Sequence, residues 1–328
     1  MAIIVTGSIA TDHLMTFPGR FTDSLVADKL DRVSLSFLVD TLEVRRGGVA
    51  ANIAFGMACL GLRPVLCDAV GEDFDDYRSW LERHGVDTDS VHVSEVHHTA
   101  RFVCTTDLEA NQLASFYPGA MSEAREIELE PVVARVGHPD LVIIGPTDPD
   151  GMLRHTDECR QRGYAFAADP SQQLARMDGP EIRHLIDGAK YLFTNEYEAA
   201  LTEQKTGWDA DEIMQRVECR ITTLGDKGAR VERRGQPLVE VGCPQEEALL
   251  DPTGVGDAFR AGFVAGLSWG LSDERCAQIG SMLATHVIET VGTQEYLLGQ
   301  ARFLDRIAQT YGDAAAADIA PHLRCPQP

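Results

Sequence analysis

Short apolar segments alternate with longer segments of helical periodicity along most of this chain of 328 residues. The apolar segments predict strands over Ile3–Val5, Val65–Asp68, Leu141–Ile144, Ala165–Ala168, Tyr191–Thr194 and Cys219–Thr223. The segments between them predict helices over 50–59, 77–84, 149–162, 180–188, 197–206 and 209–216. This alternation favours an α/β fold in which helices cover both faces of a mostly parallel sheet. Ligands of such sheets gather at the carboxyl ends of the strands.

Two regions interrupt this alternation. Residues 14–47 contain strand-like stretches at 33–39 and 42–46, and residues 91–118 contain others at 91–96, 99–106 and 112–117. These patterns predict antiparallel strands of a small accessory sheet, inserted into a single domain that spans residues 1–328. Such a sheet could act as a lid over a substrate, but it could equally be an extension of the main sheet or an oligomer contact.

The composition excludes several classes of protein. A formal net charge of −22 argues against a nucleic-acid partner, which would require a basic surface. The longest nearly apolar run, residues 261–271, is too short to span a membrane. The N-terminal Met-Ala-Ile-Ile-Val-Thr-Gly lacks the basic flank and the cleavage site of a signal peptide, so we expect a cytoplasmic protein.

A glycine-containing stretch, Asp251-Pro-Thr-Gly-Val-Gly-Asp257, comes directly before an apolar helical pattern. Gly254 and Gly256 permit a tight turn and a close approach to a ligand, and the N-terminus of the helix favours anions. Asp257 would repel a bound phosphate, but it could accept a proton from a hydroxyl group that attacks phosphorus. The alternative is that Asp257 is merely an acidic residue in the first turn of a helix.

Three further stretches could bind a nucleotide or its acceptor. Gly47-Gly48-Val-Ala-Ala-Asn52 could approach a polyol closely, although paired glycines before a helix often form only a turn. Asn195-Glu-Tyr-Glu198 could hold water around Mg²⁺ or could form a helix capping box. Thr222-Thr-Leu-Gly-Asp-Lys-Gly228 could hold phosphates or could be a hairpin turn. The common Gly-x-x-x-x-Gly-Lys-Ser/Thr and Gly-x-Gly-x-x-Gly phosphate motifs are absent.

The order of these four motifs resembles that of the ribokinase (PfkB) family of sugar and nucleoside kinases, and the resemblance covers essentially the whole chain. In that family Gly-Gly-x-x-x-Asn comes first, followed by Asn-x-x-Glu, Thr-x-Gly-x-x-Gly and Asp-Thr-x-Gly-Ala-Gly-Asp. The chain departs from the family at Val255, where alanine is usual, and at Pro252 with Thr253 after the leading aspartate. The resemblance implies a ribokinase-like three-layer αβα sandwich with a small β-sheet lid.

Within the family, three stretches are similar to the actinobacterial type of adenosine kinase. They are Gly7-Ser-Ile-Ala-Thr-Asp12-His, Phe116-Tyr-Pro-Gly-Ala-Met-Ser-Glu-Ala-Arg125 and Asp169-Pro-Ser-Gln-Gln-Leu-Ala-Arg176. This similarity implies transfer of the γ-phosphate of ATP to the 5′-hydroxyl of adenosine, which gives AMP and ADP in purine salvage.

The resemblance also implies roles on the ATP side. Asp257 would act as the general base, and the backbone N–H groups of Gly254, Val255, Gly256 and Asp257 would hold the charge that develops on the phosphate. ATP would bind along Asn195, Thr223, Leu224, Gly225, Asp226, Lys227, Gly228 and Gly256. Asn195 and Glu198 would position Mg²⁺ through water. Asp251 and Thr253, with carbonyl groups near residues 290–292, would bind K⁺.

On the acceptor side, the resemblance assigns Asp12, Gly48 and Asn52 to the ribose, with Ser8 and Ser36 as smaller contacts. Phe102 and Phe116 of the lid would stack on the adenine, although lid aromatics often serve only sheet packing. Gln172 and Gln173 would pair with the edge of the base, or they could simply belong to an exposed loop. Family members commonly dimerise through the lid sheet, so we expect a homodimer.

Two alternatives stay open at this point. The chain could be a kinase of the same family that acts on ribose, fructose, inosine or another nucleoside. It could also be a non-catalytic nucleoside-binding protein, although Asp257, Asn52, Asn195 and Glu198 are all present.

Overall fold

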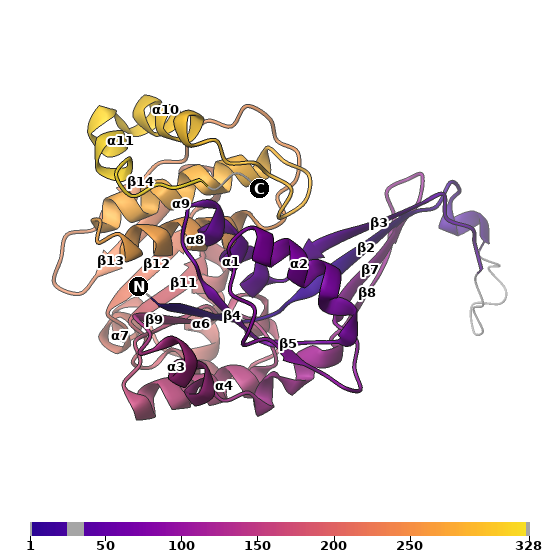
Figure 1. Cartoon of the computed structure of the whole chain (residues 1–328), viewed down its shortest axis with the longest axis horizontal. Helices are drawn as coiled ribbons and strands as arrows, with labels where there is room; N and C mark the ends of the chain where they lie inside the picture. Colours follow the sequence, from indigo (N-terminus) through magenta and orange to yellow (C-terminus); the bar gives the residue numbers. More distant parts are fainter. Residues whose placement is uncertain (1, 25–35, 326–328) are drawn as a thin grey trace.

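The computed structural model describes residues 2–24 and 36–325. Its centre is an eight-stranded sheet with the order β14-β13-β12-β11-β10-β9-β1-β4 (Figure 1). The strands from β4 to β12 run parallel, and β13 and β14 extend one edge in antiparallel orientation. Their bounds are β1 (Ile3–Thr6), β4 (Val65–Cys67), β9 (Leu141–Ile144), β10 (Phe166–Ala168), β11 (Tyr191–Asn195), β12 (Cys219–Thr223), β13 (Ala229–Arg233) and β14 (Val239–Val241). The six strands expected from the sequence are confirmed.

Helices cover both faces of this sheet, as Figure 1 shows. The strand β1 illustrates how the two layers arise. Ile3 and Val5 belong to the apolar core that includes residues of α1, α8 and α9, whereas Ile4 belongs to the core that includes residues of α3, α4 and α5. Successive strand residues point to opposite faces, so a run of apolar residues supplies both cores at once. The αβα sandwich is therefore confirmed.

The helices have the following bounds: α1 (Val49–Cys59), α2 (Asp75–Arg83), α3 (Leu129–Val136), α4 (Pro149–Arg162), α5 (Gly179–Ile186), α6 (Glu196–Thr206), α7 (Ala210–Arg216), α8 (Val255–Ser268), α9 (Asp273–Ile288), α10 (Gln300–Tyr311) and α11 (Asp313–Ile319). None of these described helices combines the length and the apolar composition that a membrane span requires.

A second sheet forms the lid and projects away from the main body in Figure 1. Its four strands have the order β3-β2-β7-β8. They are β2 (Ala10–Thr16), β3 (Thr41–Gly47), β7 (Ala100–Thr106) and β8 (Gln112–Tyr117). β2 follows β1 almost directly, and β3 leads directly into α1, so the lid is joined to the body next to the carboxyl end of β1.

The boundaries of the lid differ from the sequence expectation in three places. The lid begins at Ala10 rather than near residue 14. Residues 91–96 do not join the lid, because β6 (His92–Val93) pairs with β5 (Ala69–Val70) in a separate two-stranded sheet. Residues 36–39 form no strand, and residues 33–35 of the expected stretch lie outside the described residues. Alternating apolar residues alone did not identify the partner strand.

Candidate active site

The glycine turn before α8 has the conformation that its sequence predicts. Gly254 adopts a left-handed backbone with φ of 79° and forms the N-cap of α8. A Cβ atom on Gly254 would lie 2.9 Å from Cγ2 of Thr293, and one on Gly256 would lie 2.9 Å from Nη1 of Arg260. Gly254 is therefore favoured by its backbone conformation and by close packing, and a side chain at Gly256 would displace the guanidinium group of Arg260. Val255 begins the helix, so the first free N–H groups of α8 point into this turn.

A cavity of about 370 Å³ lies where the lid meets the body, directly beside this turn. The lining residues come from β1–β2, β3–α1, β8, the loop after β10 and the start of α8. They are Ser8, Ala10, Asp12, Gly47, Gly48, Val49, Asn52, Phe116, Met121, Gln172, Gln173, Arg176, Thr253, Gly254, Asp257 and Thr293. Most residues predicted for the acceptor side are thus brought together. Ser36 and Phe102 are not among the described residues that line the cavity.

Asn52 connects the Gly-Gly motif to the predicted base. Its Nδ2 donates a hydrogen bond to Oδ2 of Asp257 at 2.8 Å. Its Oδ1 accepts two hydrogen bonds, from Oγ1 of Thr293 and from Nε2 of Gln294, both at 2.9 Å. Because two donors fix the amide oxygen, the amide nitrogen of Asn52 must face Asp257. Asn52 therefore orients the carboxyl group of Asp257.

A second layer of hydrogen bonds fixes these partners in turn. Gln294 also donates from Nε2 to the hydroxyl of Tyr77 at 2.6 Å, and Tyr77 donates to the carbonyl of Gly47 at 2.9 Å. Oγ1 of Thr293 also lies 2.9 Å from the carbonyl oxygen of Arg46, which is a second acceptor for the single hydroxyl proton of Thr293. The network ties α1, α2, α8 and the loop after α9 to the carboxyl group of Asp257.

Burial raises the pKa of Asp257 to about 7. The nearby carboxyl groups of Asp169 and Glu198 act in the same direction, whereas the charge of Arg260 and the hydrogen bond from Asn52 oppose the rise. A carboxyl group with a pKa near neutrality can accept a proton and later release it under ordinary conditions. Asp257 is therefore suited to act as a general base.

Asp12 lies within the lid strand β2, not at the end of the first strand as expected from the sequence. Its neighbours across the lid sheet are Arg45 of β3 and Phe102 of β7, and Phe102 is opposite Phe116 of β8. Paired residues share one face of a sheet, so this row lies on the face that carries Asp12 to the cavity. Burial raises the pKa of Asp12 to about 6, and the charge of Arg45 partly offsets that rise.

The start of α1 explains why Gly48 and Ser8 belong to the site. Gly48 has φ of 94°, and a Cβ atom there would lie only 2.7 Å from Cα of Ile9. A glycine N-cap has no side chain, and Oγ of Ser8 accepts the hydrogen bond from the N–H of Val49 instead, at 3.1 Å. Ser8 thereby fastens the first strand to the helix that carries Asn52.

The two glutamines after β10 have different environments. Gln172 is exposed, whereas Gln173 is buried and donates from Nε2 to the carbonyl of Thr147 at 2.6 Å. This bond fixes Oε1 of Gln173 as the free end of the amide, and no described residue donates a hydrogen bond to it. Gln173 and Arg176 both line the cavity, so a buried hydrogen-bond acceptor without a partner and a cationic donor belong to residues of its wall.

Asn195-Glu198 forms a helix capping box and is still compatible with the predicted role around Mg²⁺. The side chain of Asn195 accepts a hydrogen bond from the N–H of Glu198, and Oε2 of Glu198 accepts one from the N–H of Asn195, both at 2.8 Å. This reciprocal capping box leaves Oε1 of Glu198 and Nδ2 of Asn195 uncommitted by it. The remaining carboxylate oxygen suits the water shell of Mg²⁺, which prefers oxygen ligands.

Residues 222–228 form a hairpin turn, as one of the two interpretations predicted. β12 pairs with antiparallel β13, and the N–H of Leu224 donates to the carbonyl of Gly228 at 2.8 Å. Gly225, Asp226 and Lys227 are exposed in this turn. The turn follows the carboxyl end of β12, next to the start of α6 at the end of β11. It therefore presents its polar groups at the expected edge of the sheet.

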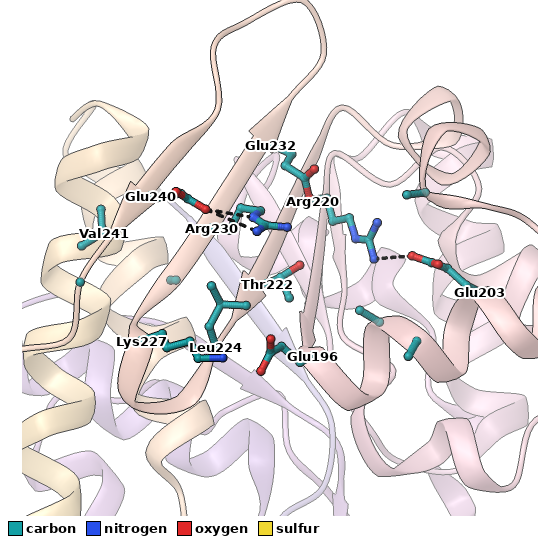
Figure 2. A pocket seen from close by; sticks show the side chains of 15 residues that line it. Glu196, Glu203, Arg220, Thr222, Leu224, Lys227, Arg230, Glu232, Glu240 and Val241 are labelled. Atoms are coloured by element: carbon teal, nitrogen blue, oxygen red, sulfur yellow. Dashed lines mark hydrogen bonds and ion pairs between the residues drawn. The ribbon is translucent and has the colours of Figure 1, made fainter.

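A larger hollow of about 640 Å³ borders this turn at Thr222, Leu224 and Lys227, and Figure 2 shows its side chains. Its arginines are already paired, because Arg220 donates to Glu203 at 3.0 Å and Arg230 donates to Glu240 at 3.4 Å. The smaller cavity beside Asp257 holds the group suited to chemistry. That cavity is therefore the candidate active site.

Asp251 joins the two segments expected around K⁺. Its Oδ1 accepts a hydrogen bond from the N–H of Thr253 at 2.9 Å, and its Oδ2 accepts one from the N–H of Gly292 at 3.0 Å. Nη1 of Arg45 lies 3.7 Å from Oδ2. The hydrogen bonds to Thr253 and Gly292 lower the pKa of Asp251, so its carboxyl group is ionised at neutral pH.

Residues 8–298 match the pfkB family of carbohydrate kinases. The chain belongs to that family. The family assignment made from the four motifs is thus confirmed.

The pfkB match is accompanied by similarity to individual relatives. The ligand-free nucleoside kinase of Burkholderia thailandensis is 35% identical with a TM-score of 0.84, covering 93% of this chain and 100% of that one. The same kinase in complex with inosine is 34% identical with a TM-score of 0.79, covering 95% and 98%. A nucleoside kinase of Methanocaldococcus jannaschii is 27% identical over 85% of this chain and 91% of its own. A cytidine kinase of Thermococcus kodakarensis is 26% identical over 75% and 88%.

Several residues of the site were missed by sequence reasoning. Thr293 and Gln294 belong to no motif, and their partner Asn52 is far away in the chain. Tyr77 also belongs to no motif, and it joins the network through Gln294. Arg260 did carry a signal, since a single arginine interrupts the apolar run of α8. Its partner Asp169 begins the stretch 169–176 that is similar to adenosine kinases, but the sequence assigned no role to Asp169.

Proposed function

We propose that this protein transfers the γ-phosphate of ATP to the 5′-hydroxyl of a nucleoside. The observation that carries the proposal is Asp257, which lines the cavity at the N-terminus of α8, is oriented by Asn52, and has a pKa that burial raises to about 7. Asp257 accepts the hydroxyl proton while the oxygen forms its bond to phosphorus. The bond from phosphorus to the bridging oxygen breaks, and ADP leaves with that electron pair.

The backbone of the glycine turn supplies the electrostatic part of the catalysis. The N–H groups of Gly256 and Asp257 have no partners within the helix and point toward its N-terminal end, whereas that of Val255 donates a long hydrogen bond of 3.4 Å to the carbonyl of Pro252. Preorganised N–H groups stabilise the charge that spreads over the phosphate oxygens in the transition state. Gly254 keeps the turn open, since a side chain there would collide with Thr293.

The donor side of the proposed reaction uses the exposed motifs. Asn195 and Glu198 would hold the water shell of Mg²⁺, and the turn from Thr223 to Gly228 would line the ATP site. Mg²⁺ bound to ATP supplies neutralisation of the phosphate charge. Asp251 and Thr253 are the proposed ligands of K⁺, next to the anion-binding turn.

Adenosine is the proposed nucleoside. Asp12 can accept hydrogen bonds from the vicinal hydroxyls of the ribose, and Phe116 offers an aromatic face in the cavity. Oε1 of Gln173 is fixed as an acceptor, which suits the 6-amino group of adenine. Inosine is the second candidate, because Arg176 can donate to a 6-oxo group and because the related Burkholderia thailandensis kinase is described with inosine.

The acceptor is tested by measuring ADP formation from ATP with adenosine, inosine, guanosine, cytidine, ribose and fructose at equal concentrations. We expect kcat/KM to be highest for adenosine, with inosine next. A higher kcat/KM for ribose or fructose would contradict a nucleoside site, and no ADP formation above the ATP-only rate would support a non-catalytic binding protein.

We also propose that the protein forms a homodimer through the lid. Leu42 of β3 and Leu113 of β8 are exposed, and the strand register places both in a row with Met15 and Thr105. This row lies on the sheet face opposite that of Asp12 and Phe116, because alternate strand residues point to opposite faces. Multi-angle light scattering should give twice the chain mass for the wild type and a monomer for Leu42→Asp with Leu113→Asp.

A further inference from the structure

Arg260 is a buried arginine directly beneath the catalytic turn. It lies on α8, three positions after Asp257, and its side chain is 8% exposed. Nη2 donates to Oδ1 of Asp169 at 2.6 Å, and Nε lies 2.5 Å from Oδ2 of the same carboxyl group. Asp169 follows β10 and is fully buried. One hydrogen bond and one ion-pair contact therefore join the guanidinium group to a carboxyl group on another element.

The same guanidinium group reaches both halves of the active site. Nη2 lies 3.9 Å from Oε2 of Glu198, which belongs to the predicted Mg²⁺ motif. Nη1 lies so close to Gly256 that a Cβ atom there would be 2.9 Å away. Arg260 thus stands between Asp169, Glu198 and the turn that carries Asp257. Because Gly256 has no side chain, the guanidinium group of Arg260 can lie against it.

Packing alone gives a weak explanation for such a pair. Buried ion pairs lose their hydration, and apolar residues of similar volume often stabilise a core equally well. The remainder of α8 follows that rule, since Phe259, Phe263 and Val264 are buried apolar residues. A fixed charge at this single position of the helix, beside the reacting carboxyl group, points to a role in the reaction.

We propose that Arg260 is a positioning residue whose positive charge, fixed by Asp169, keeps the Asp257 carboxyl group ionised and ready to accept the proton of the substrate. This inference rests on the proposed function of Asp257 as the base. Asp169 has two effects in this arrangement. It holds the guanidinium group in place, and its own negative charge opposes ionisation of Asp257.

The charged groups around Asp257 come from several elements. Asp169 after β10 and Glu198 of α6 raise its pKa, and Arg260 of α8 lowers it. Asp12 of β2 and Arg176 line the same cavity, and the phenol of Tyr77 connects to Asn52 through Gln294. The phenol of Tyr296 adds no charge, because burial raises its pKa well above the ordinary value. Arg260 is the largest of the charge effects that lower the pKa. Its removal should therefore shift the titration of Asp257 upward.

The titration of Asp257 can be measured directly in the full chain with ¹³C-labelled aspartate carboxyl groups, with the signal identified by its loss in Asp257→Asn. In Arg260→Gln we expect the midpoint to rise by about one unit, a typical effect of removing one nearby charge. The ionised fraction at neutral pH would then fall from about one half to about one tenth, and turnover would fall about fivefold and recover at alkaline pH. Arg260→Lys keeps the charge and should restore most of the midpoint.

Asp169→Asn gives the sharpest contrast, because it breaks the same buried pair. It removes one negative charge, while the amide oxygen can still accept a hydrogen bond from the guanidinium group, so the midpoint of Asp257 should fall. A purely structural pair would lower turnover in Arg260→Gln and in Asp169→Asn at every pH, with no opposite shifts of the midpoint. That result would overturn the proposal. Arg233→Gln is the matched control, since Arg233 forms a two-point pair with Asp273 on α9 and should leave the midpoint unchanged.

The outcomes separate this inference from the proposed function. If the wild type phosphorylates nucleosides but the midpoint is the same in Arg260→Gln as in the wild type, only the role of Arg260 is wrong. If Asp257→Asn retains wild-type turnover, the base assignment fails, and the inference about Arg260 fails with it even where the midpoints shift.

Discussion

The proposed acceptor half of the site, around Asp257 and Asn52, and the proposed donor half, around Asn195 and Glu198, are built in different ways. Around Asp257 and Asn52, side chains from distant segments bind one another, and most of them are buried. Around Asn195 and Glu198, the polar groups bind the backbone of their own helix start, and the turn at 224–228 closes on itself. The acceptor half is a tertiary network, whereas the donor half consists of local motifs.

This difference decides what each half can reveal about function. The capping box of Asn195 and Glu198 has the same hydrogen-bond pattern as that of Asp209 and Glu212 on α7. Its local geometry therefore carries no functional information, and only its position beside Arg260 and the end of β11 does. The network around Asp257 differs from a local motif, because it runs through Asn52 to residues of the loop after α9. We expect variants in the two halves to fail in different ways.

The largest effect is expected for Asp257→Asn. The amide keeps the size of the side chain but cannot accept the hydroxyl proton, so kcat should fall by about 10²-fold or more. Steady-state kinetics with ATP and adenosine would measure this loss, and thermal unfolding would show whether the fold is kept. Turnover within a few-fold of the wild type would mean that another group takes the proton.

Glu198→Gln tests the donor half. Glutamine can still accept the hydrogen bond from the N–H of Asn195, but it removes the charge that would organise water around Mg²⁺. We expect the Mg²⁺ concentration that gives half of the maximal rate to rise about tenfold, a typical effect of removing a group that orients the ligands of a metal. Steady-state rates measured over a series of Mg²⁺ concentrations give this value. The KM for adenosine should change little.

Glu212→Gln is the control for this variant, because Glu212 closes an equivalent capping box with Asp209 away from the site. It should leave the Mg²⁺ dependence unchanged. Equal effects of the two substitutions would show that helix capping, and not metal positioning, explains the role of Glu198.

A smaller effect is expected for Phe116→Ala in the lid. Loss of aromatic stacking on a base costs about 1–3 kcal/mol, so the KM for adenosine should rise at least about fivefold while the KM for ATP stays nearly constant. Phe102→Ala should have a weaker effect, because Phe102 pairs with Phe116 but is not among the described residues that line the cavity. A larger effect of Phe102→Ala would reverse the order of the two phenylalanines.

The sequence predicted the central sheet and most of the donor half, because both depend on local patterns. Apolar runs identified the six parallel strands, and Asn195 with Glu198 at the right spacing identified the capping box. The antiparallel edge strands β13 and β14 and the helices from α9 to α11 were not predicted as elements. Residues 91–96 were assigned to the wrong sheet, since alternation marks a strand but does not identify its partner.

The acceptor half was predicted only where family motifs covered it. Asp257 and Asn52 belong to motifs. The hydrogen bonds that orient Asn52 and the ion pair near Asp257 join residues far apart in sequence. Asp169 meets Arg260 across 91 positions, and Asn52 meets Thr293 across 241. No spacing rule connects such residues. Asp12 was predicted at the end of the first strand, because the turn between β1 and β2 has no clear signal in the sequence.

The pH dependence of kcat/KM for adenosine tests the central claim most directly, when the wild type is compared with Asp257→Asn at saturating ATP and Mg²⁺. Because burial raises the pKa of Asp257 to about 7, the wild-type rate should fall about tenfold per pH unit below neutrality. The residual rate of Asp257→Asn should not show that fall. The same acidic limb in both proteins would contradict the assignment of Asp257 as the base.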